Sequence, residues 1–344
     1  MVDKNTSNMN ILSCPIDLNW EFFISLMDYK NQLFVSNKQS DIYNFYKSFK
    51  DVDSLIKWVK ERPKGNSRII EYQGNEEIIV VIPTIDVNGE FAIRCRNEIF
   101  KGLHIIFVES GYGNYYFNYA HNCNMGIKKA IEYNPKWIIL SNDDMYKIDD
   151  INILIEQLKK IDYKNIKTVF TKPSEYHSFY AYLAKNNLFT FNFKITFDFT
   201  IWMIRHNFEK LKLILTIRLL YFKFKRYLKI NIITPEKYFA QIFNSKIIGN
   251  RKFKFINISA FGIFSGKWLK EINGELFDEN YINGVEDIDL SINLNKNSYD
   301  FDFVDYKIGD LIGQSLGKEE LRILKNIINV IYFNKKFEKY KKYI

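Results

Sequence analysis

The sequence predicts an α/β protein with an open, mostly parallel sheet flanked by helices, and two observations support that prediction. Apolar runs of strand length alternate with segments of helical period from residue 77 onward. One run, WIIL at 137–140, stops at the turn-forming residues SNDD at 141–144. Because open sheets of this class bind ligands at the carboxyl edge of their strands, we expect these acids to face a ligand crevice.

Residues 1–76 are expected to form a separate, mostly helical extension. Between Asp41 and Lys60, apolar residues recur at helical spacing among charged ones, which predicts one amphipathic helix. The sequence RPKG at 62–65 is a helix-stop signal.

The main domain is predicted to span residues 77–316. Strands and helices alternate along its first half in the order expected of a doubly wound sheet. The predicted strands are 77–82, 104–108, 136–141 and 166–170, and the predicted helices are about 89–101, 115–133 and 148–158.

Composition limits the class of protein. The 344 residues carry a net charge of +9, which suits a nucleotide, anionic lipid or nucleic acid, although biased genomic base composition also enriches Lys, Asn, Ile, Tyr and Phe. The isolated Cys14, Cys95 and Cys123 lack paired or metal-ligand spacing and indicate a reducing compartment. No signal peptide is visible, and no apolar run reaches the roughly 18–20 residues that span a bilayer. We therefore expect a cytoplasmic protein, either soluble or peripheral at the inner face of the membrane.

A second acidic segment, GVEDIDL at 284–290, lies far downstream of the first. Carboxylates repel a nucleotide diphosphate, whereas a divalent cation with oxygen ligands can join the two and neutralise the leaving group. The acids at 142–144 suit such a cation, and the second cluster can supply a carboxylate that deprotonates an incoming hydroxyl. Each cluster alone also fits ordinary turn or helix-capping chemistry.

Five blocks in order give the segment from Ile78 to about Ser315 a resemblance to family 2 glycosyltransferases of the GT-A (Rossmann-like) fold. They are IIVVIPT at 78–84, HIIFVESG at 104–111, NMG at 124–126, GELFDE at 274–279 and EDIDL at 286–290. The resemblance implies an inverting transfer of a sugar from a nucleotide-sugar donor to an acceptor hydroxyl. It also implies a divalent cation, Mn²⁺ or Mg²⁺.

The resemblance implies a role for each matching residue. Asp144 would bind the cation that bridges the diphosphate oxygens, and Asp287 would be the general base. Glu286 would orient the acceptor, while Asp289 would cap or brace its helix. The residues expected to contact the donor are Pro83, Thr84, Asp86, Glu109, Asn124, Gly126, Asn142 and Asp143.

Three residues depart from the family pattern. Asn142 stands where an acid is frequent and brings no charge to a metal. Glu109 replaces the more usual Asp, which leaves the base preference open among UDP-, GDP- and dTDP-linked donors. Asp310 replaces the His of a His-x-x-Gly-x-Ser pattern; its oxygen suits a hard cation, and an ordinary loop acid is the alternative.

The segment 172–255 matches the family weakly, so the acceptor is left open among a glycan, a lipid-linked molecule and a protein. Within it, residues 205–230 contain eight basic residues and one acid, interleaved with apolar ones. An interfacial helix on anionic lipid and a core helix with a basic edge both fit this pattern. Nucleic acid is not an expected partner, because no recognised module accompanies the charge. Residues 317–344 are expected to form a basic C-terminal helix.

Two alternatives from other classes are open. A glycoside hydrolase also uses paired carboxylates, but it needs no nucleotide site. A non-catalytic nucleotide-sugar or membrane-surface binding protein could share the fold, because a fold does not guarantee activity. The presence of Asp144 together with Asp287 favours an enzyme.

Overall fold

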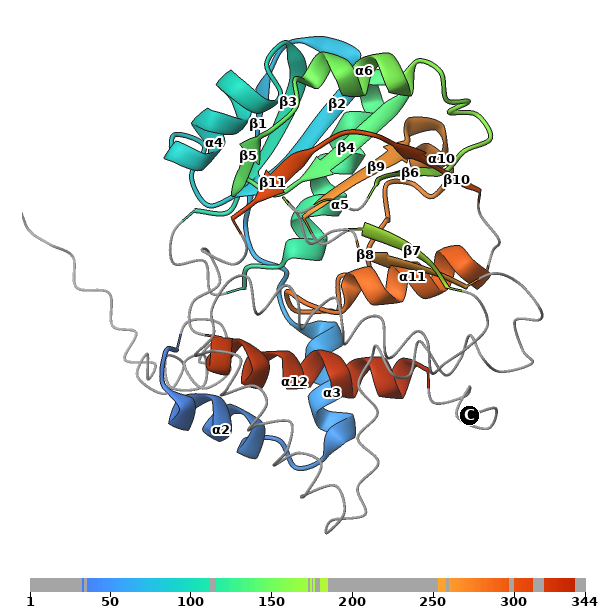
Figure 1. Cartoon of the computed structure of the whole chain (residues 1–344). Helices are drawn as coiled ribbons and strands as arrows, with labels where there is room; N and C mark the ends of the chain where they lie inside the picture. Colours follow the sequence, from blue (N-terminus) through green and yellow to red (C-terminus); the bar gives the residue numbers. More distant parts are fainter. Residues whose placement is uncertain are drawn as a thin grey trace, which may run out of the picture.

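The computed structural model describes residues 33, 36–111, 116–172, 174, 176, 180–184, 253–257, 260–296, 300–311 and 319–337. In this part of the chain, a mixed seven-stranded sheet has helices on both faces, which confirms the α/β class (Figure 1). The strand order is β1-β3-β2-β4-β9-β6-β10.

The strands of the large sheet are mostly short apolar runs. Their bounds are Arg68–Tyr72 (β1), Asn75–Thr84 (β2), Leu103–Glu109 (β3), Trp137–Ser141 (β4), Thr168–Thr171 (β6), Phe261–Ser265 (β9) and Phe301–Val304 (β10). Two small sheets pair Met145–Lys147 (β5) with Ile308–Asp310 (β11), and Tyr180–Ala184 (β7) with Phe253–Asn257 (β8). Strands β3 and β4 are buried along their whole length, which is why their sequences are apolar throughout and do not alternate.

The helices cover the sheet and form a separate layer beneath it. Their bounds are Gln39–Lys47 (α2), Val52–Glu61 (α3), Glu90–Arg94 (α4), Tyr119–Ala130 (α5), Ile151–Leu158 (α6), Gly266–Glu271 (α10), Glu286–Lys296 (α11) and Glu319–Lys336 (α12). A π-helical turn, Cys95–Ile99 (η1), continues α4, and a 3-10 turn, Ile131–Tyr133 (η2), follows α5.

The sheet is less parallel than the sequence predicts. The pairs β2–β3, β2–β4 and β6–β10 are parallel, whereas β9 is antiparallel to both β4 and β6. Strand β1 is antiparallel to β3 and lies within the segment 1–76 that we expected to be mostly helical. Its sequence, RIIEY, belongs to a half-exposed edge strand, so it lacks the long apolar run that marks the central strands.

The single helix predicted between Asp41 and Lys60 is two helices. Helix α2 ends at Lys47, and α3 begins after Asp51, whose side chain accepts a hydrogen bond from the Ser54 backbone N–H (2.8 Å). The Asp51 N–H donates in return to the Ser54 hydroxyl (3.2 Å), which completes a capping box. The new helix start turns the chain, so both helices face one core.

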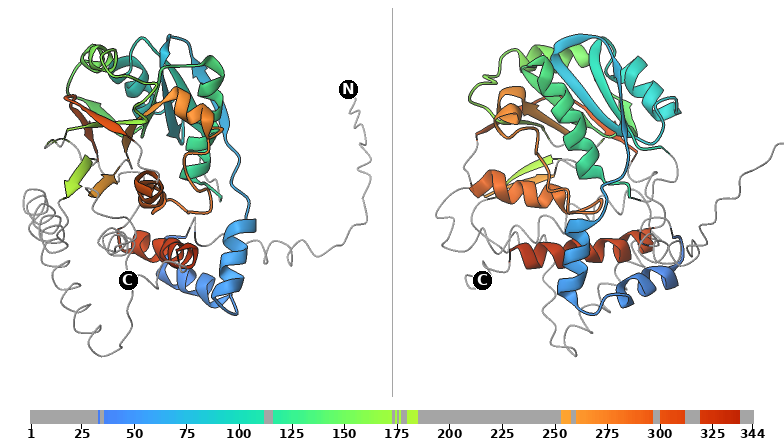
Figure 2. Two further views of the ribbon diagram at one scale, coloured as in Figure 1. Left: turned by 90° about the vertical axis from the view of Figure 1, so that its right-hand side faces the viewer. Right: turned by 180° about the vertical axis from the view of Figure 1, so that it is seen from behind.

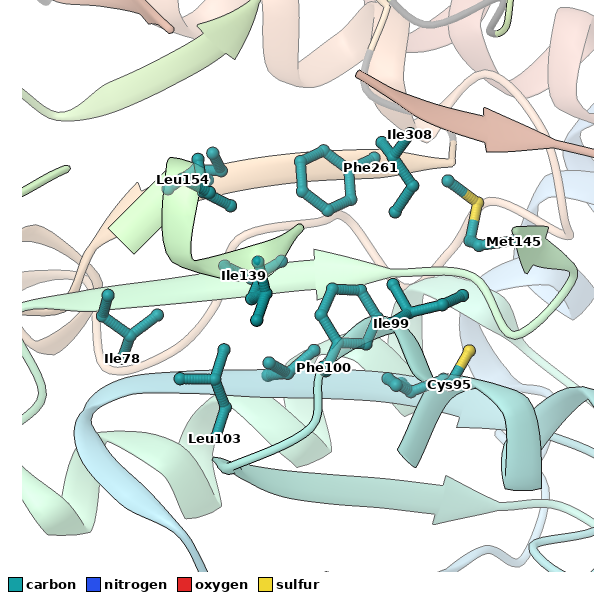
Figure 3. Close-up of a cluster of buried hydrophobic side chains, with 14 of the residues drawn as sticks. Ile78, Cys95, Ile99, Phe100, Leu103, Ile139, Met145, Leu154, Phe261 and Ile308 are labelled. Carbon is teal, nitrogen blue, oxygen red and sulfur yellow. The ribbon is translucent and has the colours of Figure 1, made fainter. Parts of the chain in front are cut away.

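Two cores cover the two faces of the sheet, and a third lies below it. One face packs against α4, η1 and α6, where Phe100, Ile139 and Phe261 lie together (Figure 3). The other face packs against α5, α10 and α11. The third core joins α2, α3 and α12 to the segment 281–292. Figures 1 and 2 show α11 between the sheet and α12.

The remaining sequence predictions concern the basic segments. The stretch 205–230 lies outside the described residues, as do 338–344, so their proposed membrane contact stays a prediction. The C-terminal helix is described over Glu319–Lys336. Among the described helices, none has the length and apolar character needed to cross a membrane.

Candidate functional site

The acids after β4 stand beside the end of β2. The Thr84 hydroxyl donates a hydrogen bond to Asp143 Oδ2 (2.6 Å), and Pro83 is the buried residue before it in β2. Because β2 and β4 are parallel neighbours, their carboxyl ends meet at the same edge of the sheet. The structure therefore brings Pro83, Thr84 and Asp143 together, as the sequence predicts.

Asp144 and Asp310 lie on adjacent pieces of chain. Strand β5 follows Asp144 directly and pairs with β11, so that Asp310 is opposite Met145. The backbone N–H of Leu311 donates to the Asp144 carbonyl (3.0 Å). The two residues proposed as metal ligands are thus neighbours, although they are distant in the sequence.

Burial dominates the electrostatics of the acids at the end of β4. It raises the pKa of Asp143, and the adjacent Asp144 carboxylate adds to that rise. Burial also raises the pKa of Asp144, against the opposing effect of the Arg94 charge. Two neighbouring buried carboxylates are costly to ionise. A hard cation that bound their oxygens would offset this cost.

Glu286 and Asp287 open helix α11, where the helix dipole favours negative charge. The Glu286 side chain is buried, and its Oε2 has no hydrogen-bond partner. Burial first, and then the Asp287 carboxylate, raise the pKa of Glu286 to about 8. Asp287 is half-buried, and its Oδ1 accepts a hydrogen bond from the Ile288 N–H (2.9 Å).

Tyr119 connects the two acid clusters. Its hydroxyl donates to Asn142 Oδ1 (3.0 Å). Burial raises the pKa of Tyr119 well above its usual value, and the carboxylates of Glu286 and Asp287 contribute to that rise. The backbone N–H of Tyr119 donates to Asn283 Oδ1 (2.8 Å), three residues before Glu286, so Tyr119 contacts both segments that carry the acids. Sequence reasoning missed Tyr119, since a tyrosine at a helix start carries no special signal.

Arg94 and Cys95 support the turn that carries the first cluster. Arg94 Nε donates to the Met145 carbonyl (2.8 Å), and the Cys95 thiol donates to the Asp143 carbonyl (3.3 Å). Arg94 Nη2 is buried without a hydrogen-bond partner. Sequence reasoning missed Arg94 too; its signal is the π-helical turn that follows it, a feature frequent at functional sites, and that turn is visible only in the structure.

Glu109 and Asp86 hold the loop after β2. Glu109 is in register with Thr84, its Oε1 accepts from the Val87 N–H (2.9 Å), and its Oε2 pairs with Arg68 Nε. The Arg68 bond is the main reason that the pKa of Glu109 lies below its usual value. Asp86 Oδ1 accepts from the backbone N–H two residues later (2.9 Å). Both acids stand at the expected edge, but each already contacts protein groups.

Asn124 and Gly126, which we expected to contact the donor, have packing roles. The Asn124 amide donates to the Phe277 carbonyl (2.9 Å) and to Glu279 Oε1 (3.0 Å), and its oxygen accepts from two backbone N–H groups of the same loop. Its hydrogen-bonding capacity is therefore used within the protein. A Cβ at Gly126 would lie 2.3 Å from Val81 Cγ1, so glycine allows α5 to lie close to the sheet.

Comparisons with known proteins assign no family or function to the chain. No family model matches the chain, and no curated protein or solved structure gives a significant match. The functional conclusion rests on the arrangement of the side chains and on the order of the sequence blocks.

Proposed function

We propose that the protein is a glycosyltransferase of the GT-A fold that moves a sugar from a nucleotide-diphosphate donor to an acceptor hydroxyl, with inversion at the anomeric carbon. The observation that supports this most is that Tyr119 contacts both acid-bearing segments, through Asn142 beside Asp143 and Asp144 and through Asn283 three residues before Glu286. Transfer requires a site for the leaving diphosphate and a base for the acceptor at the same time. One cluster suits the first task and the other suits the second.

The residues at the end of β4 fit a hard divalent cation such as Mn²⁺ or Mg²⁺. Asp144 would hold it, with Asp310 as a second oxygen ligand and Asp143 beside them. Among the described residues, no three Asp, Glu, His or Cys side chains converge into a complete metal site. Phosphate oxygens and water would therefore supply the remaining ligands, as is usual for Mg²⁺ at nucleotide sites. A cation bound there would neutralise the charge on the departing diphosphate.

Asp287 takes the proton of the acceptor hydroxyl as general base. The hydroxyl oxygen then attacks the anomeric carbon, and the bond from that carbon to the diphosphate oxygen breaks on the opposite face. Glu286 orients the acceptor; with its pKa at about 8, it carries a proton near neutral pH and can donate a hydrogen bond. Asp287 is half-buried whereas Glu286 is buried, so Asp287 is the member of the pair that an acceptor can reach more easily.

The donor is a UDP-, GDP- or dTDP-linked sugar, with Asp86 and Glu109 at the nucleoside side of the site. The acceptor is a glycan, a lipid-linked molecule or a protein, and the segment 172–255 would shape its site. A cytoplasmic location, in solution or at the inner membrane surface, suits a donor of this kind.

Calorimetric titration with the three classes of donor, in Mn²⁺ and in chelator, tests the metal role. Asp144→Asn is expected to abolish the metal-dependent part of donor binding while the protein stays folded. Asp302→Asn, at an exposed position of β10, is the matched control and should bind like the wild type. Equal affinity in metal and in chelator, for every donor that binds, would remove the metal from the proposal.

A transfer assay tests the catalytic role. Asp287→Asn is expected to lower turnover by roughly 10² to 10⁴ with little change in donor affinity, because its task belongs to the transition state. Donor binding by a wild-type protein that transfers no sugar to any acceptor class would favour the alternative, a nucleotide-sugar binding protein of the same fold.

A further inference from the structure

The residue before Glu286 has an unusual backbone conformation. Val285 has a φ of +77°, a region that β-branched residues rarely adopt because Cβ collides with the neighbouring carbonyl. Its carbonyl accepts the hydrogen bond of the Asp289 N–H (3.0 Å), so the start of α11 depends on it. A rotation at Val285 would redirect both Glu286 and Asp287. Strain of this kind persists only where the surroundings hold it.

Helix α12 holds the loop that contains Val285. Asn329, which is buried, accepts a hydrogen bond from the Ile282 N–H (2.7 Å) and donates one to the Ile282 carbonyl (2.8 Å). A Cβ at Gly284 would lie 2.7 Å from Asn326 Oδ1, so side chains of α12 lie directly against the loop. Val285 itself packs in the third core.

Two further contacts fasten the ends of the same segment. Lys336 Nζ lies 2.6 Å from Asp278 Oδ2 and 3.0 Å from Asp289 Oδ2, so one lysine of α12 joins the start of the loop to the first turn of α11. Arg62, at the end of α3, donates to the Tyr281 carbonyl (3.4 Å). Both terminal extensions therefore contact the loop that carries the acids.

We propose that Asn329 is a positioning residue: by fixing the backbone of Ile282, it keeps Val285 in its left-handed conformation and so sets the positions of Glu286 and Asp287. Its effect on a reaction rests on the proposed function, whereas its effect on the backbone of 282–289 does not.

Hydrogen exchange of the full chain, followed by mass spectrometry, tests the backbone part. Asn329→Ala is expected to raise amide exchange in 282–289 by at least about tenfold, because two hydrogen bonds to the loop are lost, while the amides of β4 keep the wild-type rate. Ile327→Ala, at an exposed position of the same helix, is the control and should leave exchange in the loop unchanged.

The pKa of the Glu286 carboxyl gives a second readout. A residue of α12 with a purely structural role elsewhere would not change this pKa. Carbon NMR of glutamate-labelled protein, with the Glu286 signal assigned from Glu286→Gln, follows the titration of Glu286. The titratable groups that interact with it are Asp287 on its own helix and Tyr119 and Cys123 on α5. In Asn329→Ala the Glu286 pKa should fall toward its ordinary range, because the acid leaves its buried position.

If Asn329→Ala does not fold, Asn329→Asp replaces it, since aspartate keeps the acceptor for the Ile282 N–H. Amide exchange in 282–289 should then be faster in Asn329→Asp than in the wild type.

Where the wild type transfers sugar, the alanine variant should lose about tenfold to hundredfold in kcat with an unchanged donor KM. A wild type that transfers no sugar would refute the proposed function and leave exchange and titration to decide the role of Asn329. Unchanged exchange in the loop with an unchanged Glu286 titration, in a folded variant, would overturn the proposal.

Discussion

Replacement of Lys336 by methionine tests how far the helical layer depends on one buried charge network. Lys336 pairs with Asp278 and with Asp289, which is 2% exposed. Methionine keeps most of the apolar stem but removes the charge. The two carboxylates would then lose their shared cation, and Asp289 would keep two neutral donors, the Tyr281 hydroxyl at Oδ1 (3.3 Å) and the Asn293 amide at Oδ2 (3.3 Å).

The size of the effect follows from the burial of the network. Removing one partner of a buried ion pair costs about 3–5 kcal/mol. The Lys336 side chain is 30% exposed, so solvent screening reduces the expected loss in the free energy of unfolding to or below the lower end of that range, at about 2–3 kcal/mol. For a chain of 344 residues, that loss corresponds to a decrease of about 3–4 °C in the melting temperature.

The loss should depend on pH in a defined direction. Burial lowers the pKa of Lys336, but the carboxylates of Asp289 and Asp278 outweigh this effect, so the net pKa is raised. The contribution of Lys336 to the free energy of unfolding is therefore fully present at neutral pH and is lost only above the ordinary lysine pKa. In the variant, buried Asp289 would hold a proton more readily than the unfolded chain does, since burial already raises its pKa. The loss in the free energy of unfolding caused by Lys336→Met therefore grows as the pH rises, and it should be larger at pH 8 than at pH 5.

Urea denaturation followed by circular dichroism at pH 5 and pH 8 measures both effects. The matched control is Lys335→Met on the same helix, because Lys335 pairs with Asp53 (3.0 Å) where both side chains are exposed. Such a surface pair contributes less than about 1 kcal/mol. The reasoning is refuted if Lys336→Met unfolds like the control, or if its loss of stability does not increase with pH.

Other parts of the structure give three more expectations. Gly126→Ala should lower the free energy of unfolding by about 1–3 kcal/mol in a denaturation experiment, because the new methyl group would overlap Val81; wild-type stability would contradict the close packing of α5. Tyr119→Phe removes the hydroxyl that contacts Asn142, and should reduce transfer turnover about tenfold while donor affinity stays within about twofold; full turnover would show that the link between the clusters has no catalytic role. Within 205–230, reversing the charge of Lys212, Lys223 and Arg226 should abolish sedimentation with anionic vesicles at low salt, whereas a wild-type protein that stays in the supernatant would exclude membrane contact.

The local features of the fold were predictable because their signals are local. Strands β3 and β4 are buried along their whole length, so continuous apolar runs mark them directly. The acids that follow β4 are equally visible, since turn residues end the run. The break between α2 and α3 was missed because the apolar period continues across it, and the capping pair Asp51 and Ser54 decides the break instead.

Strand pairing was decided by the tertiary structure. Residues 261–265 were not predicted as a strand, yet β9 inserts between β4 and β6 and runs antiparallel to both. No local pattern names the partner of a strand or its direction, because pairing depends on contacts between segments that are distant in the chain.

The candidate site was likewise predictable from the sequence only in part. The sequence alone singled out Asp144, Asp287 and their neighbours, because acids at strand and helix ends are a local pattern. Only the tertiary structure shows that Tyr119 contacts both Asn142 and Asn283 and that Arg94 bonds the Met145 carbonyl after the first cluster. It also shows that the hydrogen bonds of Asn124 are made to the loop at 276–279. These outcomes depend on which distant groups share a buried space, and burial and charge act across space regardless of sequence separation.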